Sequence, residues 1–159
     1  MNHPKNIQEV LKLWESYTLK ANELYHQQDF KQATKVFSKT VEIIEPWLEK
    51  ENRDLNTVMH LFVLACHNTA HSSYQMGRKK EAEFYYSHAH FRLLSLVSQP
   101  KPSPKLLEHA VIEIKSTFRQ LKMFLDLMNK KQLAGNIQEE SMRVLRTSYM
   151  HYVDDVFMA

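Results

Sequence analysis

The sequence predicts an all-α protein, and three observations support this. The chain has 159 residues with only two Gly and five Pro, a composition that suits long helices better than turns and strands. Apolar residues recur at intervals of three and four, the period of a helix with one buried face. A pattern of two small residues and an aromatic occurs twice. We expect about six antiparallel helices, in three helix-turn-helix pairs that form a short right-handed superhelical stack with elongated helices.

The length favours a single domain over residues 1–159, with the pairs at about 5–48, 53–98 and 103–157. Lysine and arginine number 21 against 18 acidic residues, a net charge of +3, which does not favour nucleic acid as a partner. No apolar run approaches the ~20 residues that span a bilayer, and no signal peptide is visible at the N-terminus. The single cysteine, Cys66, suits a reducing compartment. We therefore expect a cytoplasmic protein that does not act at a membrane.

The first pair of helices has the clearest start and stop signals. Asn6 and Glu9 form a capping box, in which each side chain bonds a backbone N–H of the other residue, and the helix should end by Gln28. Asp29 is positioned to cap the second helix. Pro46 predicts a break or kink near the end of that helix.

Four further helices are expected, at about 54–76, 79–97, 104–131 and 136–154. Gly77 stops the first of them, since glycine adopts the left-handed conformation at low cost. Three prolines within residues 99–104 exclude a continuous helix there. Leu133–Asn136 is predicted to be a turn, and Asn136 opens a second capping box.

The repeat is defined by small residues twelve positions apart, each pair followed by an aromatic. The two copies are Ala21, Ala33 and Phe37, and Ala70, Ala82 and Tyr86. Small residues let two antiparallel helices cross closely. With Asn22-Glu23-Leu24-Tyr25 and Gln28-Asp29-Phe30, this pattern resembles the tetratricopeptide repeat, and we expect a bacterial member of that family. The copies lie 49 residues apart instead of the family's ~34, so the helices at the junction must be longer.

The resemblance implies a scaffold without catalysis that binds a protein or peptide segment in a concave groove formed by the first, third and fifth helices. A secretion-type chaperone with such repeats has a similar size and layout. The groove residues implied are Thr18, Asn22, Tyr25, His26, His67, Asn68, His71, Tyr74, Lys115 and Arg119. Those of the first pair, from Thr18 to His26, are expected to be exposed. In some members two Asn and a Lys/Arg pair hold a peptide's C-terminal carboxylates. Asn22 and Asn68 match the Asn positions, whereas Thr18 stands where the family has its first Lys.

Lys115 and Arg119 are four residues apart, so they share a helix face on which they could bind an anionic terminus. An alternative function rests on His60, His67 and His71, which share a face and could make a metal-binding or enzymatic protein. No acidic partner accompanies them in sequence, so the groove is the favoured interpretation. We accordingly predict no cofactor and no bound metal.

The remaining features are interpreted as structural. Arg78-Lys79-Lys80 and Lys130-Lys131 are short clusters typical of solubilising turns. Cys66 lies in a core-like run and is expected to be an inert thiol. The apolar tail, residues 152–159, is expected to pack on the core, with a contact to a second subunit in a homodimer as the alternative.

Overall fold

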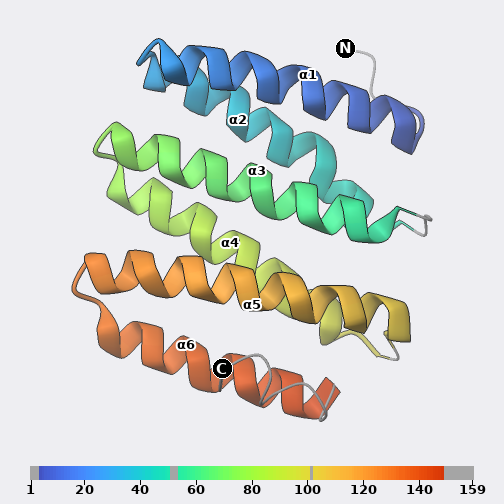
Figure 1. Ribbon diagram of the computed structural model, residues 1–159. Coiled ribbons are helices and arrows are strands. Elements are labelled where there is room, and N and C mark those ends of the chain that lie inside the picture. The colour runs from blue at the N-terminus through green and yellow to red at the C-terminus, as the bar shows by residue number, and fades with distance from the viewer. Residues whose placement is uncertain (1–3, 51–53, 101, 149–159) are drawn as a thin grey trace. The chain divides into compact units, whose positions relative to one another are not determined.

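The computed structural model describes residues 4–50, 54–100 and 102–148 (Figure 1). These residues form six α-helices and one short 3₁₀ helix, and no strand occurs among them. The elements are α1 (Ile7–His26), α2 (Phe30–Ile44), η1 (Glu45–Leu48), α3 (Leu55–Gln75), α4 (Lys79–Val97), α5 (Pro104–Leu127) and α6 (Lys131–Ser148). The prediction of an all-α fold with six helices is confirmed.

The chain divides into two compact units, Met1–Tyr85 and Tyr86–Ala159, and the boundary lies inside α4. The first unit contains α1, α2, η1, α3 and the start of α4. The second contains the rest of α4 together with α5 and α6. The single domain and the superhelical stack stay predictions, and each unit is described below by itself.

The core of the first unit forms around the contact between α1 and α2. Ala21 and Ala33 are completely buried and share an apolar cluster with Val36 and Phe37. Because alanine carries only a methyl group, the two backbones can approach closely while Phe37 fills the space beside them. Three partly buried side chains of α1 pack against this cluster, namely Tyr17, Leu24 and Tyr25. The close crossing expected from the small residues is therefore present.

A buried pair of hydroxyl groups joins α2 to α3. The Oγ1 atom of Thr34 lies 2.6 Å from Oγ of Ser72. Thr34 also lies 2.7 Å from the carbonyl oxygen of Phe30, one turn earlier in its own helix. Both side chains are almost completely buried, so each needs such a partner. The contact fixes the position of α3 along α2.

The same turn closes all three helix pairs. Gln28, Gly77 and Asn129 each adopt a positive φ, of 63°, 75° and 60°. In each turn the next residue donates its N–H to a carbonyl five positions back: Asp29 to Leu24, Arg78 to Ser73 and Lys130 to Leu125, at 2.8–3.0 Å. This arrangement satisfies carbonyl groups at the helix end that have no partner within the helix. Gln28 and Gly77 occupy matching positions of the predicted repeat.

The third turn was predicted at the wrong place. α5 ends at Leu127 instead of about Lys131, and α6 begins at Lys131 instead of Asn136. Asn129 supplies the left-handed residue, which asparagine tolerates better than most residues. Gly135 therefore lies inside α6, and Leu133–Asn136 is helix and not a turn.

The helix starts in the first unit follow the predicted caps with one difference. The side chain of Asn6 accepts from the backbone N–H of Glu9 at 2.9 Å. The carboxylate of Glu9 accepts from the N–H of Lys5 at 2.7 Å, and not from that of Asn6 as a capping box requires. Asp29 accepts from the N–H of Gln32, as predicted. Pro46 lies in η1, directly after the end of α2, so the predicted break is confirmed.

A buried histidine lies in the core of the second unit and links its helices. His90 of α4 is completely buried, with Nδ1 2.9 Å from Oγ1 of Thr117 in α5 and Nε2 2.7 Å from Oγ of Ser141 in α6. Its ring lies 5.8 Å from that of Phe118. One side chain of α4 therefore contacts both other helices of this unit. Large apolar side chains around it are completely or almost completely buried, among them Leu93, Ile114, Leu121 and Leu145.

The predicted tail, residues 152–159, lies outside the described residues, as does the predicted continuation of the sixth helix to about Asp154. Within the described part of the chain, no helix is both long and apolar enough to cross a membrane.

Candidate functional site

An aromatic cluster lies where α1 and α3 approach each other in the first unit. The ring of Tyr25 is 5.8 Å from that of His71 and 5.0 Å from that of Phe30. The ring of His26 is 6.3 Å from Tyr25 in an edge-on arrangement. These distances are typical of aromatic pairs that stabilise each other. Three of the predicted groove residues, Tyr25, His26 and His71, therefore come together from two helices.

The local sequence explains why these rings meet. The positive φ of Gln28 reverses the chain within three residues, and Asp29 caps α2 at once. Phe30 then starts α2 beside Tyr25 and packs edge-on against it. Tyr25 was expected to be exposed, but it is partly buried because it packs against Phe30, His71 and the α1–α2 core cluster.

The ten predicted groove residues differ in exposure. Four are exposed: Asn22, His26, His71 and Arg119. Six are partly buried: Thr18, Tyr25, His67, Asn68, Tyr74 and Lys115. The expectation that Thr18 is exposed was wrong, because its hydroxyl oxygen is buried and has no hydrogen-bond partner in the described part of the chain. The carboxylate-binding set is divided between the units, with Asn22 and Asn68 in the first and Lys115 and Arg119 in the second, and it stays a prediction.

The three histidines of the alternative function have unlike surroundings. His60 and His71 are exposed, whereas burial lowers the pKa of His67 to about 4. His67 is therefore neutral at pH 7. Among the described residues, no group of three or more His, Cys, Asp or Glu side chains is placed to hold a metal ion.

The environment of Cys66 does not activate its thiol. The side chain is completely buried. Burial, and to a smaller extent the negative charge of Glu45, raises the pKa of Cys66 far above its usual value. Because the thiolate is the reactive form, this thiol is protonated and unreactive at neutral pH.

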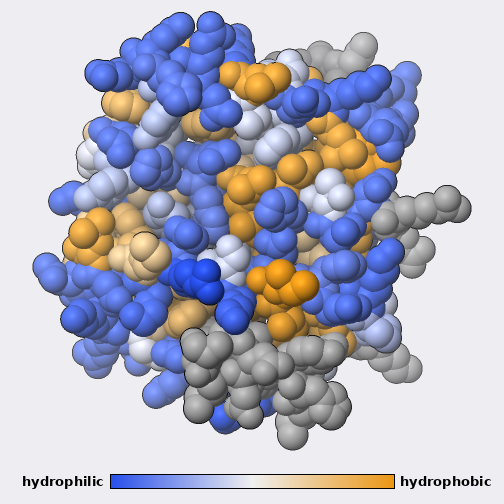
Figure 2. All heavy atoms as spheres, in the orientation of Figure 1, coloured by the Kyte–Doolittle hydropathy of each residue, from blue (hydrophilic) through white to orange (hydrophobic). Residues whose placement is uncertain are grey.

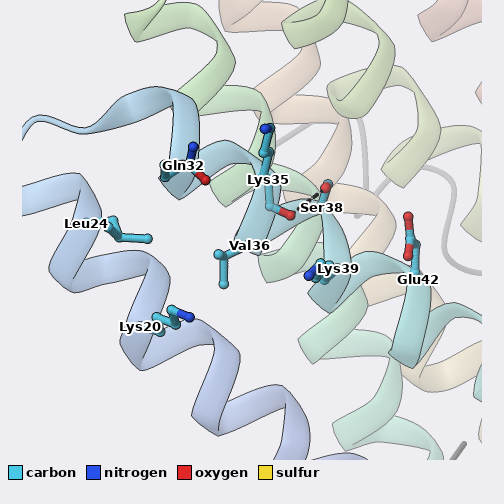
Figure 3. Close-up of a pocket in the computed structure, with 8 residues that line it drawn as sticks. All are labelled: Lys20, Leu24, Gln32, Lys35, Val36, Ser38, Lys39 and Glu42. Atoms are coloured by element: carbon cyan, nitrogen blue, oxygen red, sulfur yellow. Dashed lines mark hydrogen bonds between the residues drawn. The ribbon is translucent and has the colours of Figure 1, made fainter. Parts of the chain in front are cut away.

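A lysine-lined hollow lies on the outer side of the first unit, and sequence reasoning missed it. It has a volume of about 470 Å³ and is formed by residues of α1 and α2 (Figure 3). Lys20 and Leu24 project from α1 toward Val36 of α2, and Lys35 and Lys39 follow along α2. The residues lining it are Lys20, Leu24, Gln32, Lys35, Val36, Ser38, Lys39 and Glu42.

A smaller hollow of about 110 Å³ adjoins the same helix. Lys35 and Ser38 line both hollows, and Arg78 and Tyr85 reach the smaller one from the turn before α4 and from α4. Lys31, Thr34 and Glu81 complete its lining. None of the ten predicted groove residues lines either hollow. The spacing of Lys31, Lys35 and Lys39 was the signal available in the sequence, since residues four apart share a helix face.

In the second unit, α5 presents a partly apolar outer face. Ile112, Met123 and Leu127 are 64%, 61% and 60% exposed. They recur with Arg119 at intervals of seven, four and four residues, which keeps all four on one side of the helix. On the face drawn in Figure 2, apolar side chains form small separate groups among hydrophilic ones. Arg119 forms no ion pair with any described residue, whereas Lys122 is bound to Asp126 at 2.7 Å.

A family model described as "Protein of unknown function (DUF2753)" matches residues 12–148. The match covers most of the chain, so the chain belongs to this family. No curated protein and no solved structure is similar enough to the chain to count as a match.

Proposed function

We propose that this member of the DUF2753 family is a cytoplasmic, tetratricopeptide-like scaffold that binds a segment of another protein and catalyses no reaction. The partner segment carries apolar side chains and at least one carboxylate. It contacts the outer face of α5. The binding is chaperone-like in that it is non-covalent and leaves the partner's chemistry unchanged.

The observation that carries the proposal is the outer face of α5. Ile112, Met123 and Leu127 each leave more than half of their surface in water. Covering apolar surface contributes roughly 25 cal/mol per Å², so a partner that covers these three side chains gains affinity. Exposed apolar side chains that share one face of a helix can mark a protein contact site. The face is therefore suited to an apolar segment.

Arg119 gives the same face a preference for acidic partners. Its guanidinium lies between Ile112 and Met123 in the helical order and is not engaged by an acidic side chain of the described residues. A guanidinium can donate two parallel hydrogen bonds to one carboxylate. Lys115, one turn earlier, adds a second positive charge.

The first unit, taken by itself, also offers exposed polar groups to a peptide. Asn22, His26 and His71 are exposed, and the packing of Tyr25 against His71 holds α1 and α3 together beneath them. Amide and imidazole groups can donate and accept hydrogen bonds with an extended peptide backbone.

The test is a calorimetric titration with a short peptide that has alternating apolar side chains and ends in two acidic residues. We expect saturable binding by the wild type and about tenfold weaker binding by Arg119→Ala, the loss typical of one charge-assisted hydrogen bond. Met123→Ser should also weaken binding. Arg146→Ala is the matched control, since Arg146 is exposed on α6 and its loss changes the net charge equally. No saturable binding by the wild type, or equal losses in Arg119→Ala and Arg146→Ala, would refute the proposal.

A further inference from the structure

We propose that the outer face of α2 is a second binding surface, which takes an extended acidic segment of another protein. The lysine stripe, defined as Lys31, Lys35 and Lys39, carries the interaction, and Lys20 of α1 adds to it. This surface belongs to the first unit and does not depend on the α5 face.

This surface carries mostly positive charge, and most of its cationic side chains form no ion pair with a described residue. Its two hollows are lined by five cationic side chains, Lys20, Lys31, Lys35, Lys39 and Arg78, against two acidic ones, Glu42 and Glu81. Arg78 and Glu81 already pair with each other at 3.6 Å. In contrast, Lys20, Lys31 and Lys35 form no ion pair with any described residue. A chain with a net charge of only +3 thus concentrates unpaired positive charge on one helix face.

The spacing of the lysines suits an extended chain. Residues four apart on a helix are separated by about 6 Å along its axis. Alternate residues of an extended strand point to the same side and repeat every ~6.6 Å. A segment with acidic residues at every second position can therefore place successive carboxylates near Lys31, Lys35 and Lys39. Each ammonium group can bind one carboxylate without a change in the backbone of α2.

The surface also offers groups for the rest of such a segment. Leu24 and Val36 give the larger hollow an apolar floor, which can take the β- and γ-carbons of the partner's side chains. Ser38 donates its hydroxyl to the carbonyl of Lys35 at 2.8 Å, so its oxygen is left to accept from a partner N–H. Gln32 can donate and accept.

An acidic protein segment fits this surface better than nucleic acid. Single-stranded nucleic acid is held by stacking of bases on aromatic side chains beside a basic groove. Of the two tyrosines near the stripe, Tyr85 is partly buried, and the ammonium of Lys39 lies 5.9 Å over the ring of Tyr17. Neither ring is left open as a stacking platform.

The probe is a peptide of alternating Glu and Thr residues, titrated against the full chain at low salt. Its control has the same composition with all Glu residues in one block. Two variants have the same net charge: the stripe variant combines Lys31→Gln, Lys35→Gln and Lys39→Gln, and the control variant combines Lys12→Gln, Lys105→Gln and Lys131→Gln. All six lysines are exposed, so both variants should fold. Circular dichroism checks that they do.

We expect the alternating peptide to bind the wild type more tightly than the block peptide. The stripe variant should lose about tenfold or more in affinity and the control variant less than threefold, the order expected for three exposed ion pairs. Equal losses in both variants would overturn the proposal, because they would show that only the net charge matters. Tighter binding of inorganic polyphosphate or of an oligonucleotide, with the same loss in the stripe variant, would overturn the assignment to an acidic protein segment. Loss of binding in Arg119→Ala concerns the α5 face alone, so the two surfaces are tested separately.

Discussion

The Nε2 atom of His90 lies 2.7 Å from the hydroxyl oxygen of Ser141, in a contact that is completely buried. The hydroxyl of Ser141 also lies 2.7 Å from the carbonyl oxygen of Ile137. On the other side of the ring, the hydroxyl of Thr117 likewise contacts both His90 and the carbonyl oxygen of Ile114. A neutral imidazole has one N–H, so one of the two hydroxyls must donate to the ring and the other must accept from it.

The first prediction concerns stability against pH. Burial lowers the pKa of His90 to about 4, whereas the unfolded chain has the ordinary value of 6.5. As the pH falls below 6.5 the unfolded state binds the proton first, so the stabilisation present above pH 6.5 is lost toward pH 4. We expect His90 to account for a loss on the order of 2 kcal/mol in the free energy of unfolding between pH 7.5 and 5.

Urea denaturation at the two pH values measures this loss. His67, whose pKa is also lowered to about 4, contributes in the same direction, so His90→Phe should reduce the loss without abolishing it. An NMR titration that shows His90 protonated with a midpoint near 6.5 would contradict the prediction.

The second prediction uses the hydroxyl partners of the ring. Ser141→Ala leaves one ring nitrogen of His90 buried without its partner, which should cost about 1–3 kcal/mol of unfolding free energy. In the background of His90→Phe, the same Ser141→Ala change should cost much less, because the hydroxyl then bonds only the carbonyl of Ile137. A double-mutant cycle by urea denaturation measures the difference. Equal costs in both backgrounds would mean that the contact stabilises nothing.

The third prediction compares the two glycines of the chain. Gly77 has a φ of +75°, which an L-residue adopts only with strain, so Gly77→Ala should destabilise by about 1 kcal/mol. Gly135 lies inside α6 with open space around its Cα, so Gly135→Ala should stabilise by about 0.5–1 kcal/mol. Thermal unfolding followed by circular dichroism shows whether each substitution raises or lowers the stability. Destabilisation by Gly135→Ala would favour a turn at this position.

The fourth prediction concerns Gln28, which has a φ of 63°. A residue with a side chain is strained in this conformation and glycine is not, so Gln28→Gly should stabilise by up to about 1 kcal/mol. Asn129→Gly should gain less, because asparagine tolerates the conformation better. Gln27→Gly is the control, since Gln27 has a φ of −77° and should gain nothing. The three midpoints of thermal unfolding can be compared directly.

Much of the fold could be predicted because its signals are local. The observed bounds of α4 are the predicted ones, and the observed bounds of α3 differ from the predicted ones by one residue at each end. The third turn could not be predicted because two residues compete for it. Gly135 is the stronger turn signal in the sequence, but the chain reverses at Asn129, which has a positive φ.

The candidate sites were predicted less well than the fold. The contact of Tyr25 with His71 joins two members of the predicted groove, but the His90–Thr117–Ser141 contact joins residues 27 and 51 positions apart that no periodicity connects. The lysine stripe could have been predicted from the sequence, because its three lysines lie on one helix at a spacing of four residues. Its significance depends on the absence of acidic partners among the described residues, which only the structure shows.

The continuity of α4 has a consequence for cooperativity. The boundary between the units falls between Tyr85 and Tyr86, in the middle of a helix and not in a linker. A helix of seven residues, the part of α4 that precedes the boundary, is too short to persist in isolation. Because backbone hydrogen bonds of α4 cross this boundary, we expect melting of either unit to destabilise the other, and we predict a single unfolding transition for the chain.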